Sequence, residues 1–187
     1  KVKGRKGRLA GYVSATGSAG TIAAGDYLRV KFPAVRVGAS EALQCPTLLA
    51  NGFGEHRIEG IGDKHIPWVH NVRNTDMVVA IDDEDCMRLL RLFNDPAGKK
   101  HLIAEGVNKE AVESLALLGI SGISNMLSAV KMAKYYELGR EDIVFTIFTD
   151  SVEMYRSRLA ELEAEHGKYD ERSAAMDMDR RMRGAAT

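Results

Sequence analysis

Five small residues between an apolar segment and a helical one form the most suggestive chemical motif of the chain. Gly17-Ser18-Ala19-Gly20-Thr21 follows the apolar segment 9–15 and precedes segment 21–32, which is typical of a helix. Small side chains let consecutive backbone N–H groups face one concavity, and the N-terminus of the following helix adds its dipole. Ser18 and Thr21 add hydroxyl donors. The motif by itself fits a phosphate-binding turn and a tight turn without a ligand equally well.

Two well-known phosphate motifs are excluded at this turn. Gly17 and Gly20 are three residues apart, so the dinucleotide-binding pattern G-x-G-x-x-G is absent. No Gly-Lys-Ser/Thr follows, so the turn is not a P-loop. Any anion bound here is therefore held in another way.

Strand-like and helix-like segments alternate four times along the chain. The expected strands are 9–15, 35–40, 76–82 and 143–149, and the expected helices are 21–32, 82–93, 117–139 and 150–167. This alternation predicts an α/β fold, a three-layer αβα arrangement with a mostly parallel sheet. Ligands bind at the carboxyl ends of such strands. The predicted ligand-binding segments are 16–21, the start of "GISG" at 119, and 149–151.

Three parts of unequal size are expected: a basic leading segment 1–8, an α/β domain 9–165, and a polar tail or short peripheral helix over 166–187.

The 187 residues include 26 Lys and Arg and 26 Asp and Glu, so no net charge attracts nucleic acid or anionic lipid. The two cysteines, Cys45 and Cys86, suit a reducing compartment. No apolar run is long enough to span a bilayer, so we expect a cytoplasmic protein with no membrane and no nucleic-acid partner.

Four motifs give the sequence a resemblance to a known family. Segment 9–28, "LAGYVSATGSAGTIAAGDYL", resembles the strand, glycine-rich loop and helix of fold-type II pyridoxal 5′-phosphate (PLP) enzymes, the cysteine synthase, cystathionine β-synthase and tryptophan synthase β group. Segment 56–62, "HRIEGIG", is similar to their His-Lys-Ile-Gln-Gly-Ile-Gly. "LLGISGIS" at 117–124 is similar to their Gly-Ile-Ser-Ser-Gly, and "FTDSVEMY" at 148–155 to their Pro-Asp-Ser-Val or Pro-Ser-Ser-Gly. The four occur in family order.

The resemblance implies roles for individual residues. Gly17, Ser18, Ala19, Gly20 and Thr21 would bind the cofactor phosphate. Ser151 would lie at the pyridine nitrogen, where a neutral hydroxyl leaves the ring a weaker electron sink than a carboxylate does. Asp150 is the alternative for that contact; its other expected role is a helix cap with Glu153. Gly60, Ile61 and Gly62 would line the substrate side. We expect no catalytic residue and no metal ligand in this chain.

The family's Schiff-base lysine lies upstream of its glycine loop, and here only Lys1, Lys3 and Lys6 precede that loop. We therefore expect the chain to correspond to the C-terminal half of the enzyme and to be inactive alone. The parent would act on a small amino acid by β-elimination or β-replacement, as a cysteine synthase, cystathionine synthase, dehydratase or desulfhydrase. Its partner would be a second copy or the N-terminal half. The alternative is a non-catalytic phosphate-ligand-binding or assembly module of the same fold.

Other reactive side chains favour structural roles. A histidine-rich loop could hold a metal, but nothing in the spacing makes its ligands converge; its members are Glu55, His56, Asp63, His65 and His70. The acids 82–85 are typical of a helix N-terminus. Trp68, the only tryptophan, is expected to pack the long loop onto the sheet.

Overall fold

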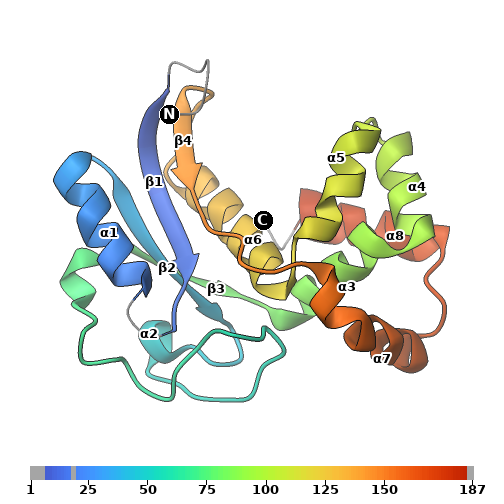
Figure 1. Ribbon diagram of the computed structural model, residues 1–187, viewed down its shortest axis with the longest axis horizontal. Coiled ribbons are helices and arrows are strands. Elements are labelled where there is room, and N and C mark those ends of the chain that lie inside the picture. The colour runs from blue at the N-terminus through green and yellow to red at the C-terminus, as the bar shows by residue number, and fades with distance from the viewer. Residues whose placement is uncertain (1–6, 18–19, 185–187) are drawn as a thin grey trace.

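A parallel four-stranded sheet forms the centre of the structure, a computed structural model that describes residues 7–17 and 20–184 (Figure 1). The strand order is β3-β2-β1-β4. The strands are β1 (Arg8–Ala15), β2 (Arg36–Ala42), β3 (Met77–Ile81) and β4 (Asp142–Phe145). Every neighbouring pair is parallel, with Val13 opposite Gly38 and Tyr12 opposite Phe145. Parallel pairing requires crossover connections, and helices provide them here.

Helices cover both faces of the sheet, which confirms the predicted three-layer α/β fold. Helix α1 (Gly20–Lys31) lies on one face, where a Cβ on Gly25 would come within 2.7 Å of the Val37 side chain. Helix α6 (Ile120–Tyr135) lies on the other face. Its Met132 packs so closely onto the sheet that a Cβ on Gly11 or Gly38 would lie 2.6 Å from the Met132 thioether. Glycine at these positions therefore permits the close approach.

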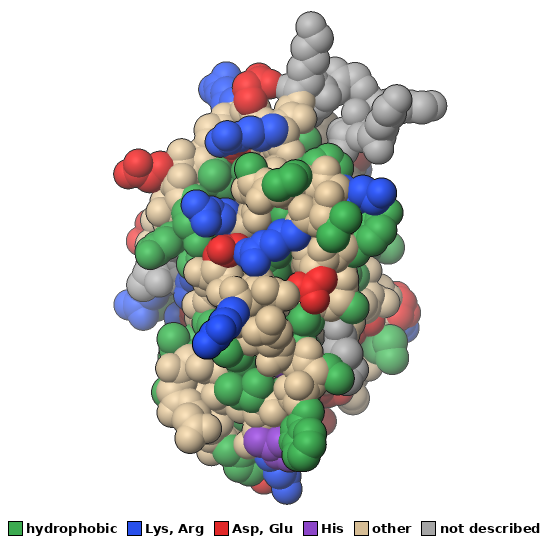
Figure 2. Space-filling model, turned by 90° about the vertical axis from the view of Figure 1, so that its left-hand side faces the viewer, with side chains coloured by type: hydrophobic (Ala, Val, Ile, Leu, Met, Phe, Trp, Pro, Cys, Tyr) green, Lys and Arg blue, Asp and Glu red, His purple; other side chains and the backbone are tan. Residues whose placement is uncertain are grey.

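The outer surface of α1 is mixed in character. Tyr27, Val30 and Phe32 are exposed on or just after this helix. Figure 2 shows apolar side chains on this face scattered among basic and acidic ones. Across the described ranges, 7–17 and 20–184, no single helix has the length and apolar composition to cross a membrane. Segments Lys109–Leu117 and Ile120–Tyr135 meet that test only together, and they are bent by 119° relative to each other.

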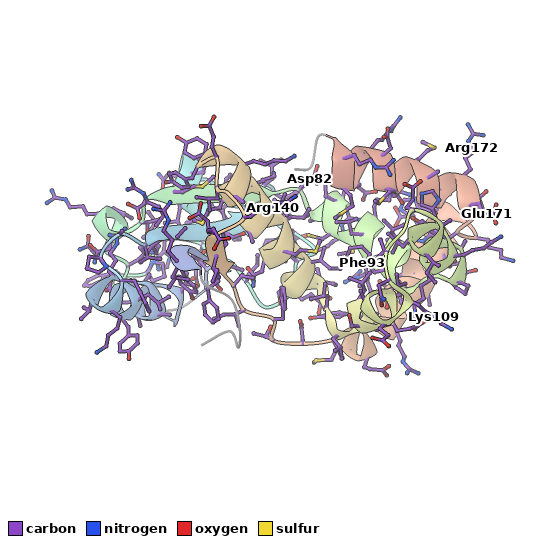
Figure 3. All side chains as sticks on the ribbon, turned by 90° about the horizontal axis from the view of Figure 1, so that it is seen from above. Asp82, Phe93, Lys109, Arg140, Glu171 and Arg172 are labelled. Atoms are coloured by element: carbon purple, nitrogen blue, oxygen red, sulfur yellow. The ribbon has the colours of Figure 1, made fainter. Side chains whose placement is uncertain are left out.

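A second group of helices packs beyond α6 (Figure 1). It consists of α3 (Asp83–Asn94), α4 (Pro96–Ala104), α5 (Lys109–Ser114), η2 (Leu115–Leu117), η3 (Val152–Tyr155) and α7 (Arg156–His166). Helix α3 is its centre, and most of its apolar residues are buried. Figure 3 shows Phe93 of α3 within this group and Arg140 at the turn before β4. Two short helices, α2 (Thr47–Ala50) and η1 (Val72–Asn74), lie in the long loop between β2 and β3.

The last described segment is helical. It holds α8 (Glu171–Asp177) and a π-helical turn, η4 (Met178–Arg183). Tyr169 and Ala174 are buried, and the Arg91 guanidinium lies 4.8 Å from the centre of the Tyr169 ring while donating to the carbonyl of Gly167. Residues after 165 thus pack on α3 and α4. The domain division at residues 8 and 165 stays a prediction.

Two local expectations are wrong. The strand predicted over 143–149 ends at Phe145. After it, the Thr146 hydroxyl rather than a backbone amide donates to the Val13 carbonyl of β1, and the Ile147 carbonyl accepts from the side chain of Asn125, as described below. Trp68 does not pack onto the sheet: it is 97% exposed. The loop is held instead by buried Ile58 and by polar contacts of Arg57.

Replacement of Met132 tests the packing between α6 and the sheet. Met132→Ala would leave an unfilled space above two glycines that cannot move to close it. We expect the free energy of unfolding to fall by about 2–5 kcal/mol. Met176→Ala, on the exposed side of α8, is the matched control and should change it by less than about 0.5 kcal/mol. Denaturant unfolding measures both; equal effects would contradict the packing described.

Candidate active-site cleft

The described residues of the glycine turn, Gly17, Gly20 and Thr21, carry backbone donors without a protein partner in the described part of the chain. Thr16 continues β1 by donating its amide to the Ser40 carbonyl at 2.8 Å, and α1 begins at Gly20. Within the described residues, no protein group accepts a hydrogen bond from the amides of Gly17, Gly20 or Thr21. A Cβ on Gly17 or Gly20 would meet none of the described residues within 4 Å. The open turn and the helix N-terminus together suit an anion.

The other predicted phosphate ligands differ in their accessibility. Ser18 and Ala19 lie outside the described residues. The Thr21 hydroxyl donates to the Ala15 carbonyl at 2.8 Å, so its O–H is already used within the protein. Thr21 can therefore serve an anion through its backbone amide.

The substrate-side segment lies directly against this turn. The amide of Gly62 donates to the Thr16 carbonyl at 2.8 Å. Gly60 and Gly62 have φ of 80° and 87°, a conformation that favours glycine. A Cβ on Gly62 would also lie 2.9 Å from His56 Nε2. Ile61 is half-buried against the core. The structure thus brings together two motifs that are about 40 residues apart in the chain.

A small cavity opens between the turn and the loop. Its walls are Thr16, Gly17, Glu41, Thr47, Leu48, Gly62, Asp63, His65, Ile66, Pro67 and His70. Glu41 is only 2% exposed, and its carboxylate accepts from the amides of Leu48 and Leu49 at 2.8 and 2.9 Å. Burial lowers the pKa of His70, against the opposing effect of Asp26, so the neutral ring is favoured. No lysine is among these lining residues.

The histidines and acids of this loop do not form a metal centre. In the ranges that the structure describes, no three His, Cys, Asp or Glu side chains are grouped to hold a metal ion. His70 Nε2 instead lies 3.0 Å from the Thr75 hydroxyl. Both cysteines are free and buried, and burial raises the pKa of the Cys86 thiol.

The side-chain amide of Asn125 joins β1 to the segment after β4. Its Oδ1 accepts from the amide of Ala15 at 2.7 Å, and its Nδ2 donates to the carbonyl of Ile147 at 2.8 Å. Asn125 is 3% exposed. In a longer β4, the Ala15 amide and the Ile147 carbonyl would pair with each other. Here each of them bonds to the side-chain amide of Asn125 instead. This is the physical reason that the predicted strand 143–149 stops early.

The carboxylate of Asp150 is held against the start of α6. Its Oδ1 accepts from the Ser121 hydroxyl at 3.3 Å, and its Oδ2 accepts from the Tyr155 hydroxyl. Its backbone carbonyl accepts from the Gly119 amide at 3.0 Å. Burial, and then the adjacent Asp150 carboxylate, raises the pKa of Tyr155, so this phenol remains a donor. The predicted helix cap by Asp150 with Glu153 is wrong, because this carboxylate bonds to α6 and to Tyr155.

Ser151 is left with an unused hydroxyl. It is half-buried and extended, with φ of −129° and ψ of 168°, at the start of η3. Its hydroxyl has no hydrogen-bond partner among the residues that the structure describes. Two residues were considered for the ring nitrogen. The Asp150 carboxylate is already hydrogen-bonded, whereas the Ser151 hydroxyl has no partner among the described residues.

Arg57 fastens the long loop to α3. Its backbone amide and its guanidinium both donate to the Asp83 carboxylate, at 2.9 and 2.8 Å, and the guanidinium also reaches Glu84 at 2.7 Å. Burial alone would raise the pKa of Asp83 and of Glu84. The hydrogen bonds and charge of Arg57, with Arg88 added at Glu84, outweigh burial and leave both pKa values below their ordinary range.

The polar face of α6 went unrecognised in the sequence. Ser121, Asn125 and Ser128 are spaced four and three residues apart, and all three are buried. Polar residues at helical spacing among apolar ones were the available signal. Apolar periodicity alone identifies the helix but not what its polar side holds.

Comparisons with known proteins agree with the fold and with the family resemblance of the sequence. Cysteine synthase B of Campylobacter jejuni is 29% identical over 147 residues, which are 78% of this chain and 42% of that protein. The O-acetylserine dependent cystathionine beta-synthase of Bacillus subtilis is 29% identical over 156 residues, 81% of this chain and 43% of that protein. The chain thus spans less than half the length of these curated relatives. No family model matches the sequence.

Solved structures support the same relationship. The O-acetylserine dependent cystathionine beta-synthase of Helicobacter pylori has a TM-score of 0.59 and 29% identity, covering 80% of this chain and 42% of that chain. Cysteine synthase of Entamoeba histolytica has a TM-score of 0.65 at 20% identity, covering 91% and 45%, and shows the fold alone. The chain has the fold of part of a fold-type II PLP enzyme. It is a relative of the cysteine synthase and cystathionine β-synthase group, as the motifs predicted.

The Arg57 contact gives a testable pH dependence. Arg57→Met removes the partner of a buried carboxylate but leaves aliphatic bulk, and we expect a loss of about 1–3 kcal/mol in unfolding free energy at neutral pH. Because the pKa values of Asp83 and Glu84 are lowered in the folded state, this contribution is full above the ordinary carboxylate range near about pH 4. The stabilisation by Arg57 disappears as the pH falls through the lowered pKa values of Asp83 and Glu84.

The control is Arg156→Met, which removes an exposed ion pair with Glu153. Unfolding free energies of the two variants and the unmodified chain, measured from pH 7 down to pH 3, check the expectation. If the loss of unfolding free energy caused by Arg57→Met grew as the pH was lowered, the assignment would be contradicted.

Proposed function

We propose that this chain forms the phosphate and ring-nitrogen side of a PLP site. The amides of the turn 17–21 hold the phosphate, Ser151 meets the pyridine nitrogen, and Gly60, Ile61 and Gly62 line the substrate side. The supporting observation is a pair of donor sets, at the glycine turn and at Ser151, that have no partner among the described residues. Asn125 bonds to Ala15 before the turn and to Ile147 before Ser151. Both belong to motifs that the chain shares with PLP enzymes.

The residues of the chain also suit one type of chemistry. When bound, PLP withdraws electrons from the α-carbon of an amino acid. The Ser151 hydroxyl donates to an unprotonated ring nitrogen, which moderates this withdrawal and favours β-elimination or β-replacement on a small amino acid. The relatives are named as cysteine synthases and as an O-acetylserine dependent cystathionine beta-synthase, which agrees with this class. We therefore propose a lyase or transferase of this type.

None of the described lining residues is a lysine, so the proposal assigns the amine chemistry to a lysine outside this lining. The described cavity walls carry no arginine either. Cofactor binding and substrate chemistry are thus expected to depend on a second set of residues that faces this cleft.

A partner surface is available beside the cleft. Strand β4 is at the edge of the sheet, and Phe145 and Phe148 are 50% and 52% exposed, with Ile147 between them partly exposed. The run 143–149 has no charge and no proline, so nothing in it opposes pairing with another strand. We propose that this edge is covered by a second copy of the chain or by the N-terminal half of the enzyme.

Binding of pyridoxine 5′-phosphate tests the cofactor site without requiring a lysine, because this compound has no aldehyde. We expect saturable binding by the chain in a calorimetric titration. Gly17→Val should weaken it at least tenfold, because the side chain enters open space beside the turn and leaves the fold intact. Gly139→Val, at a loop glycine with comparable room, is the control and should bind as the unmodified chain does.

A chain that binds neither this compound nor inorganic phosphate would contradict the proposed cofactor site. Equal affinity of Gly17→Val and the unmodified chain would show that the phosphate binds elsewhere than at the turn. Unfolding midpoints of both valine variants verify that the comparison is between folded proteins.

Sedimentation velocity tests the partner surface. We expect the chain to self-associate as its concentration rises, and Phe148→Lys to weaken this association at least fivefold by placing a charge on the apolar edge. Tyr135→Lys, a change at an exposed aromatic on α6 away from that edge, is the control. A monomer at every concentration, or equal effects of both variants, would argue against an interface between copies at β4.

A further inference from the structure

Asp150 is fixed at both its backbone and its side chain. The carbonyl accepts from the Gly119 amide, and the two carboxylate oxygens accept from Ser121 and Tyr155. The preceding residue is also held, since the Thr149 hydroxyl lies 3.2 Å from the Ser121 hydroxyl. Segment 149–151 therefore cannot turn without breaking contacts to the first turn of α6.

The place of this carboxylate is electrostatically favourable. Helix α6 has 16 residues, and its N-terminus carries the positive end of the helix dipole. The Ser121 and Tyr155 hydroxyls add two charge-assisted hydrogen bonds. An anion held by these groups gains little by moving to another partner, although Asp150 is next to the residue proposed for the ring nitrogen.

Gly119 makes this arrangement possible. A Cβ at this position would overlap the Asp150 carboxylate, Oδ1 first and then the carboxyl carbon and Oδ2. The residue is extended, with φ of −78° and ψ of −175°, so its backbone could accept any amino acid. The space for the carboxylate, rather than backbone conformation, thus requires glycine here.

We propose that Asp150 is a positioning residue for the ring-nitrogen contact: Ser121, Tyr155 and Gly119 hold its carboxylate at the start of α6, so that Ser151 alone meets the ring. This inference rests on the proposed function. It also goes beyond it, because it explains how a carboxylate one residue from the contact is kept from protonating the ring. Two hydroxyl donors and the space left by the missing Cβ of Gly119 hold the carboxylate in place.

The near-ultraviolet spectrum of bound pyridoxine 5′-phosphate distinguishes the protonated ring from the unprotonated one. It therefore reports whether the Asp150 carboxylate is kept away from the ring nitrogen. At neutral pH we expect the unmodified chain to bind the unprotonated form. Gly119→Ala displaces the carboxylate and should at least triple the protonated fraction. The double variant Gly119→Ala with Asp150→Asn removes the displaced charge and should restore the unmodified spectrum.

Tyr155→Phe provides a second test that adds no volume to the protein. It removes one donor from the carboxylate and should shift the spectrum in the same direction by a smaller amount. Arg156→Met, next in the chain but on an exposed ion pair, should leave the spectrum unchanged. Inorganic phosphate affinity should be the same in all these variants, because the turn 17–21 is untouched.

The outcomes separate this inference from the proposed function. If the probe binds and the spectra of Gly119→Ala and Tyr155→Phe match that of the unmodified chain, Asp150 does not position the contact. A protonated ring in the unmodified chain that is lost in Asp150→Asn would overturn the inference in favour of direct contact by Asp150. Absence of both probe and phosphate binding would overturn the proposed function, and this inference with it.

Discussion

The arrangement of the cleft depends on one buried amide. Asn125 stands where a peptide group would stand if β4 continued beside β1, and it satisfies one donor and one acceptor that the two segments leave open. A buried amide without partners would cost several kcal/mol, roughly 2–7 by transfer measurements. With both partners present, it ends the sheet at a defined residue and lets the chain after β4 turn toward α6.

Helix α6 serves two purposes along its length. Near its C-terminal end, Met132 fills the space above the sheet glycines and anchors the helix to β1 and β2. Near its N-terminal end, polar side chains hold the segments on either side of the cleft. Because one rigid helix carries both sets of contacts, the position of Ser151 relative to the end of β1 is coupled to the packing of the core. The loop with Gly60 and Gly62 is fixed separately, through Arg57 on α3 and the Gly62 amide on Thr16.

Much of the fold could be predicted from the sequence, because strands and helices of this size carry strong periodic signals. Four strands, the helices on both faces and the family relationship follow from local patterns and from the order of four motifs. The length of β4 could not be predicted, since it is limited by a side chain that is 22 residues upstream of Ile147. The position of Trp68 was also beyond reach, because an aromatic residue in an irregular loop has no periodic neighbours to indicate its burial.

The backbone motifs of the candidate site are visible in the sequence, whereas the side-chain contacts around them are not. Glycines at a turn are visible as a local composition, and the structure places Gly62 against Thr16 beside Gly17. The spacing of Asp150 and Glu153 is equally local but misleading, because the tertiary partners Ser121 and Tyr155 bind the carboxylate more closely than a helix end does. Contacts between distant segments decide such cases, and a single sequence does not record them.

A crystal structure of the chain with pyridoxine 5′-phosphate tests most directly the claim that α6 holds both sides of one cofactor site. The account predicts the phosphate on the amides of the turn 17–21, the ring nitrogen within hydrogen-bond reach of the Ser151 hydroxyl, and the Asp150 carboxylate still bonded to Tyr155. A phosphate bound away from the turn, or a ring nitrogen on the Asp150 carboxylate, would contradict it.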